Sequence, residues 1–135
     1  FPHPYTPAAA RAWLGFVAQK TPETDFALAV GGEAAGGIGI TLREDVARRS
    51  AEIGYWMGRA HWGRGLATAA VRALTDWAFA HFDLCRLDAS VFDWNPASAR
   101  VLEKAGYVLE GRLRKSATKD GRTIDQLLYA RVLGA

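Results

Sequence analysis

Cysteine is nearly absent from this chain of 135 residues, because Cys85 is the only one. A single cysteine forms no intrachain disulfide, so a packed core has to hold the fold together. The three histidines lack the spacing of a metal site. No apolar stretch reaches the length of a membrane-spanning helix. We therefore expect a soluble, cytoplasmic domain that binds no metal and enters no membrane.

The chain has little excess charge of either sign, since its 17 basic and 14 acidic residues give a net charge of +3. That excess lies in one segment, residues 110–122, which has five basic and two acidic side chains. A nucleic-acid binder usually has a wider basic surface interleaved with stacking aromatic residues, so we do not expect a nucleic-acid partner. The segment either protects a strand edge with solvated charge or faces an acidic partner.

What the chain does have is a clear alternation of helical and extended patterns, with half of its residues hydrophobic. Its length suits one domain. Helical spacing predicts three helices, at residues 8–20, 65–82 and 96–104. Extended patterns predict six strands, at residues 26–30, 35–43, 51–57, 85–93, 107–118 and 123–133. This order indicates an α/β domain built on a mixed, mainly antiparallel sheet.

Local signals fix several boundaries. Asn95 and Pro96 are typical of a helix start. Asp120 and Gly121 form a strong hairpin signal between the last two strands. In the helix at 65–82, Thr75 is expected on the polar face.

A glycine-rich turn, Trp62-Gly63-Arg64-Gly65-Leu66-Ala67-Thr68, follows a strand and opens the second helix. Such a turn presents backbone N–H groups at the positive end of a helix dipole, which suits a phosphate group. No Gly-Lys-Ser/Thr follows, so this is not a P-loop. Taken alone, the turn is equally well explained as a tight link between a strand and a helix.

Three ordered motifs together resemble the GNAT superfamily of N-acetyltransferases, in particular its RimJ/RimL-like branch. They are Ile53 to Met57, Trp62 to Thr68, and Asn95 to Tyr107 with Ser98 and Gly106 inside it. The resemblance spans nearly the whole chain and implies the GNAT fold, with acetyl-CoA as co-substrate and no metal. It also implies a sheet splayed between the strands at 52–57 and 85–92, where the pantetheine arm lies.

The family's usual first strand and helix would precede Phe1 and are missing from these residues. If they are absent from the native protein, an exposed sheet edge would favour a homodimer.

The resemblance also implies the residues that hold the co-substrate. Main-chain groups of the strand would hold the pantetheine, and the glycine-rich turn would hold the pyrophosphate. Asn95 either bonds a pantetheine amide or only caps its helix. The implied set is Tyr55, Trp56, Met57, Trp62, Gly63, Arg64, Gly65, Leu66, Ala67, Thr68, Asn95 and Ser98.

Two positions depart from the family pattern. Leu102 stands where many members have a tyrosine that protonates the leaving thiolate, and Ser98 is the expected substitute. Ala117 stands where some members have an acidic residue. For the general base we expect Glu52 first and Glu110 second, although each also fits an ordinary solvated strand residue.

The implied reaction is direct transfer of an acetyl group to a primary amine, without an acyl intermediate on Cys85. A peptide α-amine has a pKa of about 7.7–8.0, against about 10.4 for lysine. The α-amine therefore needs less help from a base, which favours a protein or peptide N-terminus as acceptor. The alternatives are a small-molecule amine as acceptor and a non-catalytic module that binds acyl-CoA.

Overall fold

The computed structural model describes residues 24–30, 33–58 and 65–134. The helix expected at 8–20 lies outside these ranges. The described elements follow the predicted order. They are β1 (Asp25–Val30), β2 (Glu33–Leu42), the short 3-10 helix η1 (Asp45–Ala47), β3 (Ser50–Met57), α2 (Leu66–His81), β4 (Arg86–Phe92), α3 (Pro96–Lys104), β5 (Val108–Lys119) and β6 (Arg122–Val132).

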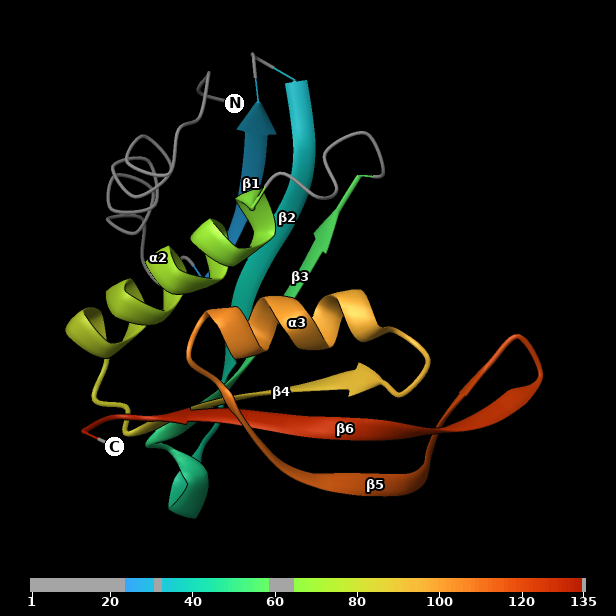
Figure 1. Cartoon of the computed structure of the whole chain (residues 1–135). Helices are drawn as coiled ribbons and strands as arrows, with labels where there is room; N and C mark the ends of the chain where they lie inside the picture. Colours follow the sequence, from blue (N-terminus) through green and yellow to red (C-terminus); the bar gives the residue numbers. More distant parts are fainter. Residues whose placement is uncertain (1–23, 31–32, 59–64, 135) are drawn as a thin grey trace.

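The six strands form one sheet in the order β1-β2-β3-β4-β6-β5 (Figure 1). Every neighbouring pair is antiparallel except β3 and β4, which are parallel. The crossover that makes them parallel contains α2, as a parallel connection requires. The expected α/β class with a mixed, mainly antiparallel sheet is confirmed.

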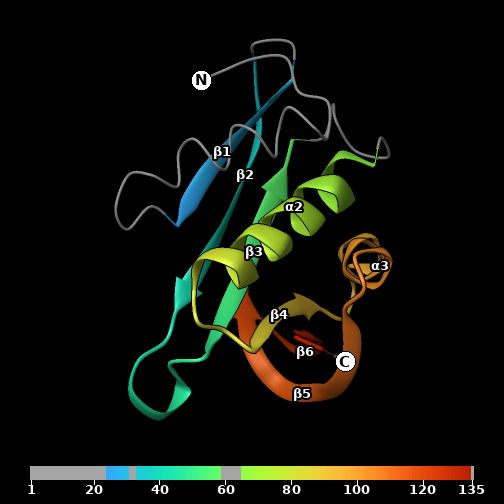
Figure 2. The ribbon, with the colours of Figure 1, turned by 90° about the vertical axis from the view of Figure 1, so that its left-hand side faces the viewer.

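Helices α2 and α3 both cover one face of this sheet (Figures 1 and 2). The core beneath them includes the fully buried side chains Val71 and Leu74 of α2, Leu87 of β4 and Leu102 of α3. Of the helices that the structure describes, none is long and apolar enough to cross a membrane. The two helices thus anchor the sheet from one side and hold β3 and β4 at fixed positions.

The position of Thr75 differs from the prediction. It was expected on the polar face of α2, but it is buried, and its hydroxyl lies 2.7 Å from that of Tyr107. The approach of the segment after α3 brings a phenol to this face of α2. A hydroxyl pair then satisfies both polar atoms inside the core.

The hairpin between β5 and β6 has the predicted two-residue turn. Asp120 and Gly121 both have positive φ, 53° and 74°. Two left-handed residues match the right-handed twist of the flanking strands. The hairpin therefore continues beyond the end of β4 as a paired ribbon (Figure 1).

Candidate functional site

The central feature of the site is the divergence of β3 from β4. They pair only at Ser50–Arg86, Ala51–Leu87 and Glu52–Asp88. Beyond this point β3 continues along β2, and β4 continues along β6 as far as Phe92. The sheet is therefore splayed at the strand pair that the family resemblance implies, and β3 has no pairing with β4 after Glu52. Such an edge suits an extended ligand.

A cluster of four charged side chains, here the vertex cluster, lies where the two strands separate. It consists of Arg43, Asp88, Arg86 and Glu110. Arg43 donates to both carboxylate oxygens of Asp88 at 2.8 Å, and Nε of Arg86 donates to Asp88 at 3.0 Å. Arg86 also contacts Glu110 at 2.8 Å. Because Arg86 and Asp88 belong to β4, Glu110 to β5, and Arg43 directly follows β2, the cluster connects strands on both sides of the splay.

The electrostatics of the vertex cluster follow from these contacts. Burial raises the pKa of the Asp88 carboxyl, but the hydrogen bonds and charges of Arg43 and Arg86 outweigh it and leave that pKa below its usual value. The hydrogen bond from Arg86 likewise lowers the pKa of Glu110. Both carboxylates are therefore charged near neutral pH.

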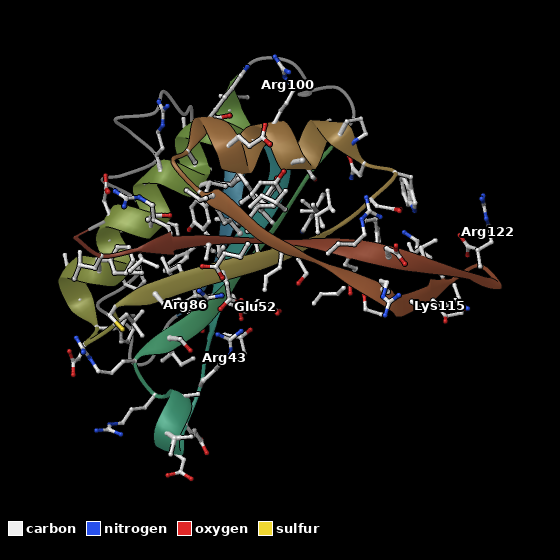
Figure 3. The ribbon with its side chains drawn as sticks, turned by 60° about the horizontal axis from the view of Figure 1, so that its bottom comes forward. Arg43, Glu52, Arg86, Arg100, Lys115 and Arg122 are labelled. Atoms are coloured by element: carbon white, nitrogen blue, oxygen red, sulfur yellow. The ribbon has the colours of Figure 1, made fainter. Side chains whose placement is uncertain are left out.

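The two candidate bases have different surroundings. Glu110 accepts hydrogen bonds from Arg86, which make it a weaker proton acceptor. Glu52 is exposed and forms the last pair of β3 with β4, and its charge contributes to the raised pKa of Arg43. Figure 3 labels Glu52 beside Arg43 and Arg86 at the vertex. This arrangement favours Glu52 over Glu110 as the base.

At the start of α3, Asn95 and Ser98 form a reciprocal pair. The side-chain oxygen of Asn95 accepts from the backbone N–H of Ser98, and its amide nitrogen donates to the Ser98 hydroxyl, both at 3.3 Å. The capping role weighed for Asn95 is thus present. Within the described part of the chain the hydroxyl hydrogen of Ser98 has no acceptor, so it is available to another group.

One side chain connects β3 with the start of α3, the helix that follows β4. The Tyr55 hydroxyl on β3 donates to the main-chain oxygen of Ser98 at 3.0 Å. Burial raises the pKa of this phenol, so it stays protonated and remains a donor at neutral pH. The sequence motif includes Tyr55, but no sequence pattern indicates that its hydroxyl contacts α3.

We expect Tyr55→Phe to loosen this connection at little cost to the fold, because the ring is kept and the Ser98 oxygen remains within a helix. Amide hydrogen exchange in the first turn of α3 should become faster, and the free energy of unfolding should fall by about 1 kcal/mol or less. Tyr107→Phe is the matched control. It leaves buried Thr75 unpaired, and should cost about 1–3 kcal/mol without a selective effect on α3. Equal exchange in the two variants would contradict the role given to Tyr55.

The N-terminal turn of α2 carries part of the predicted phosphate cradle. Gly65 precedes it with φ of 73°, a left-handed conformation that favours glycine. The turn has no side-chain cap and no acidic residue, so the amides of Leu66, Ala67 and Thr68 are open to an anion. Trp62, Gly63 and Arg64 lie outside the described residues.

The described residues therefore fit an acyl-CoA ligand, with a strand edge for its amide-bearing arm and a helix start for its phosphates. Among these residues, no group of three or more His, Cys, Asp and Glu side chains is placed to hold a metal ion. Fold and site together define an α/β acyltransferase-like domain.

Comparison with known proteins gives the family. The model of the acetyltransferase (GNAT) domain matches residues 1–108. The probable N-acetyltransferase YjcK of Bacillus subtilis is 45% identical over 84 residues, 62% of this chain and 46% of that protein. The ribosomal-protein-serine acetyltransferase of Escherichia coli is 33% identical over 91 residues, 63% of this chain and 48% of that protein. The chain thus spans about half the length of these curated relatives.

Solved structures agree with this result. RimL, a ribosomal alpha-N-protein acetyltransferase solved in complex with coenzyme A, has a TM-score of 0.74 at 25% identity, covering 80% of this chain and 60% of that one. A GNAT acetyltransferase from Streptococcus pneumoniae has a TM-score of 0.78 at 25% identity, covering 91% and 74%. The chain belongs to the GNAT acetyltransferase family, and similarity to RimL is consistent with the RimJ/RimL-like branch.

Proposed function

We propose that this chain catalyses transfer of the acetyl group of acetyl-CoA to a primary amine, and that the acceptor is the N-terminal α-amine of a protein or peptide. The observation that carries the proposal is the separation of β3 from β4 after Glu52 and Asp88. Ser98 lies near this separation, because its main-chain oxygen accepts a hydrogen bond from Tyr55 of β3. An acetyl thioester supplies an activated acetyl group. The remaining tasks belong to side chains and main-chain groups of the protein.

Binding is assigned to two regions. Main-chain groups of Tyr55, Trp56 and Met57 would hold the pantetheine arm along β3. The amides at the start of α2 would hold the pyrophosphate, together with Trp62, Gly63 and Arg64. One helix terminus contributes only about 0.3–2 kcal/mol per charge, so affinity requires contacts from both regions. The Asn95 side chain is engaged in its cap, and its role is to fix Ser98.

Ser98 is proposed as the proton donor to the leaving thiolate. Its oxygen is held by Asn95 and its hydrogen has no acceptor among the described residues. Leu102, at the family's tyrosine position, is fully buried in the core and has no proton to give. Ser98 and Leu102 are one helical turn apart, so the serine offers a hydroxyl on the same side of α3.

The acceptor amine must be neutral when it attacks. Glu52 is proposed to take its proton, directly or through water, because it is exposed at the vertex and, unlike Glu110, forms no ion pair with an arginine of the described residues. An α-amine has a pKa about 2.5 units below that of lysine, a difference of about 3.4 kcal/mol. Because an α-amine loses its proton more easily than lysine, a solvated and therefore weak base such as Glu52 suits an N-terminal amine as acceptor.

A small-molecule amine is the second candidate acceptor. The L-amino acid N-acetyltransferase AaaT of Escherichia coli is 24% identical over 132 residues, 97% of this chain and 79% of that protein. That likeness covers more of this chain than the match to the ribosomal-protein enzyme. A non-catalytic module is the third candidate, because the side chains of Leu102 and Ala117 can act neither as acid nor as base.

The test measures thiol release from acetyl-CoA with purified protein across N-terminal peptides, polyamines and amino acids, beside calorimetric titration with coenzyme A. We expect binding of coenzyme A and release that depends on a peptide. Release with small amines alone would replace the proposed acceptor. Binding without release would indicate the non-catalytic module, and no binding would contradict the proposed function.

A further inference from the structure

The tip of the β5–β6 hairpin keeps its excess of positive charge in the folded chain, because the acidic residues near it are used elsewhere. Two of the acidic residues around it are already paired, because Arg112 contacts both Asp93 at 3.1 Å and Asp125 at 3.0 Å. Glu110 is paired with Arg86. Within residues 110–122, four cations then remain without an ion-pair partner in the described part of the chain, and the acid left in this segment is Asp120. These four are Arg114, Lys115, Lys119 and Arg122.

Lys119 and Arg122 are the two cations that flank the turn of the hairpin. They line a shallow depression together with Trp94, Ile124 and Asp120. The Lys119 ammonium lies 5.4 Å from the centre of the Phe92 ring, and that ring stacks on Trp94 with centroids 5.4 Å apart. Trp94 is 57% exposed. The depression thus combines two cations with an accessible aromatic wall.

Its place in the fold relates it to the acceptor. Phe92 is the last residue of β4 and pairs with Gln126, at the open end of the splay. The hairpin extends past this point on the side where α3 begins (Figure 1). On β6, Arg122 precedes Gln126 by four positions and precedes Ala130, the partner of Asp88 beside Glu52, by eight, which is about 13 to 26 Å in a strand. A peptide chain in extended conformation covers that distance with roughly four to eight residues.

We propose that this hairpin tip binds acidic side chains of the acceptor polypeptide, located roughly four to eight residues after the amine that is acetylated. The proposal rests on the proposed function, since it assigns the acceptor's chemical class. Charge complementarity is its basis, because unpaired cations attract carboxylates and steer their approach. The neighbouring Trp94 surface would cover the peptide backbone and strengthen these charge contacts by excluding water.

Two synthetic peptides with the same first four residues test the proposal, one with Glu at positions five to nine and one with Gln there. Acetyl transfer gives one readout, and fluorescence anisotropy of labelled peptides gives a second that needs no turnover. At low ionic strength we expect kcat/KM and affinity to be about tenfold higher for the Glu peptide, with the difference shrinking as salt is added.

The decisive variant is the double substitution Lys119→Glu with Arg122→Glu, which should remove or reverse the preference for the Glu peptide. Arg48→Glu with Arg49→Glu is the matched control, since it changes net charge equally at the exposed end near η1, and should keep the preference. Affinity for coenzyme A should be unchanged in both.

Equal binding of the Glu and Gln peptides by the unmodified protein would overturn the proposal, even if transfer to both is efficient. So would a loss of preference in the control as large as in the hairpin variant. If no peptide is acetylated but the hairpin variant selectively loses affinity for the Glu peptide, the acidic site stands and the proposed reaction fails. The two readouts therefore separate the two hypotheses.

Discussion

Asp88→Asn is expected to lower the free energy of unfolding by about 2–3 kcal/mol. The side chain of Asp88 is 7% exposed and neutralises Arg43 and Arg86, which are 33% and 29% exposed. Breaking a fully buried pair costs about 3–5 kcal/mol, and the partial exposure of both arginines reduces that figure. Urea unfolding at neutral pH measures the change as a lower midpoint with the slope unchanged.

Asp83→Asn is the matched control. Asp83 also pairs with an arginine, Arg49, at 3.3 Å, but its side chain is 86% exposed. A surface pair of this kind contributes about 0–1 kcal/mol. Similar losses in the two variants would show that the vertex cluster is not a special support of the fold.

The effect of Asp88 should also depend on pH. Its pKa is lower in the folded protein than in the unfolded chain, so its contribution is present above the unfolded value, about 3.9. As the pH falls from there through the folded pKa, the unfolded chain binds the proton first and that stability is lost. The difference between the native protein and Asp88→Asn should therefore be constant above about pH 5 and narrow below about pH 4. A difference that widens in acid would contradict the assigned charge state.

Ser98→Ala is expected to lower kcat about 100-fold, within the range of a missing general acid. Affinity for coenzyme A should change little, and the fold should persist. The side-chain oxygen of Asn95 accepts its capping hydrogen bond from the backbone N–H of residue 98. Alanine keeps that N–H, so the cap is preserved. An acetyl thioester with a more acidic thiol should reduce the defect, because its thiolate leaves with less need of a proton.

Cys85→Ala serves as the control for this experiment. Cys85 lies just before β4, and its backbone forms hydrogen bonds with Arg49 and Leu133. Transfer should continue at nearly the native rate, as expected for a reaction without a cysteine intermediate. If Ser98→Ala is as active as Cys85→Ala with every acetyl donor, Ser98 is only part of the helix start.

Sequence patterns were most informative where the cause is local. The alternation in β4, the Asn95-Pro96 start of α3 and the Asp120-Gly121 turn depend on neighbouring residues, and each element was placed within two residues. The motifs also located the splay, because they resemble a family whose sheet opens at this strand pair. Contacts between distant segments were not predicted. Asp88 alternates with Leu87 and Ala89 in the way typical of a solvent-facing residue, so the sequence pattern does not indicate that it is buried.

The sequence by itself determined the class of fold, the order of the elements and the family, because hydrophobic periodicity and turn chemistry are written in consecutive residues. Only the tertiary structure decided how charges and hydroxyls are used. Arg43 is 45 positions from Asp88, and Tyr55 is 43 from Ser98. Such pairs form when packing of the helices against the sheet brings separate strands together. The same packing places Glu110 in an ion pair with Arg86 and leaves Lys119 and Arg122 at the hairpin tip without an acidic partner among the described residues.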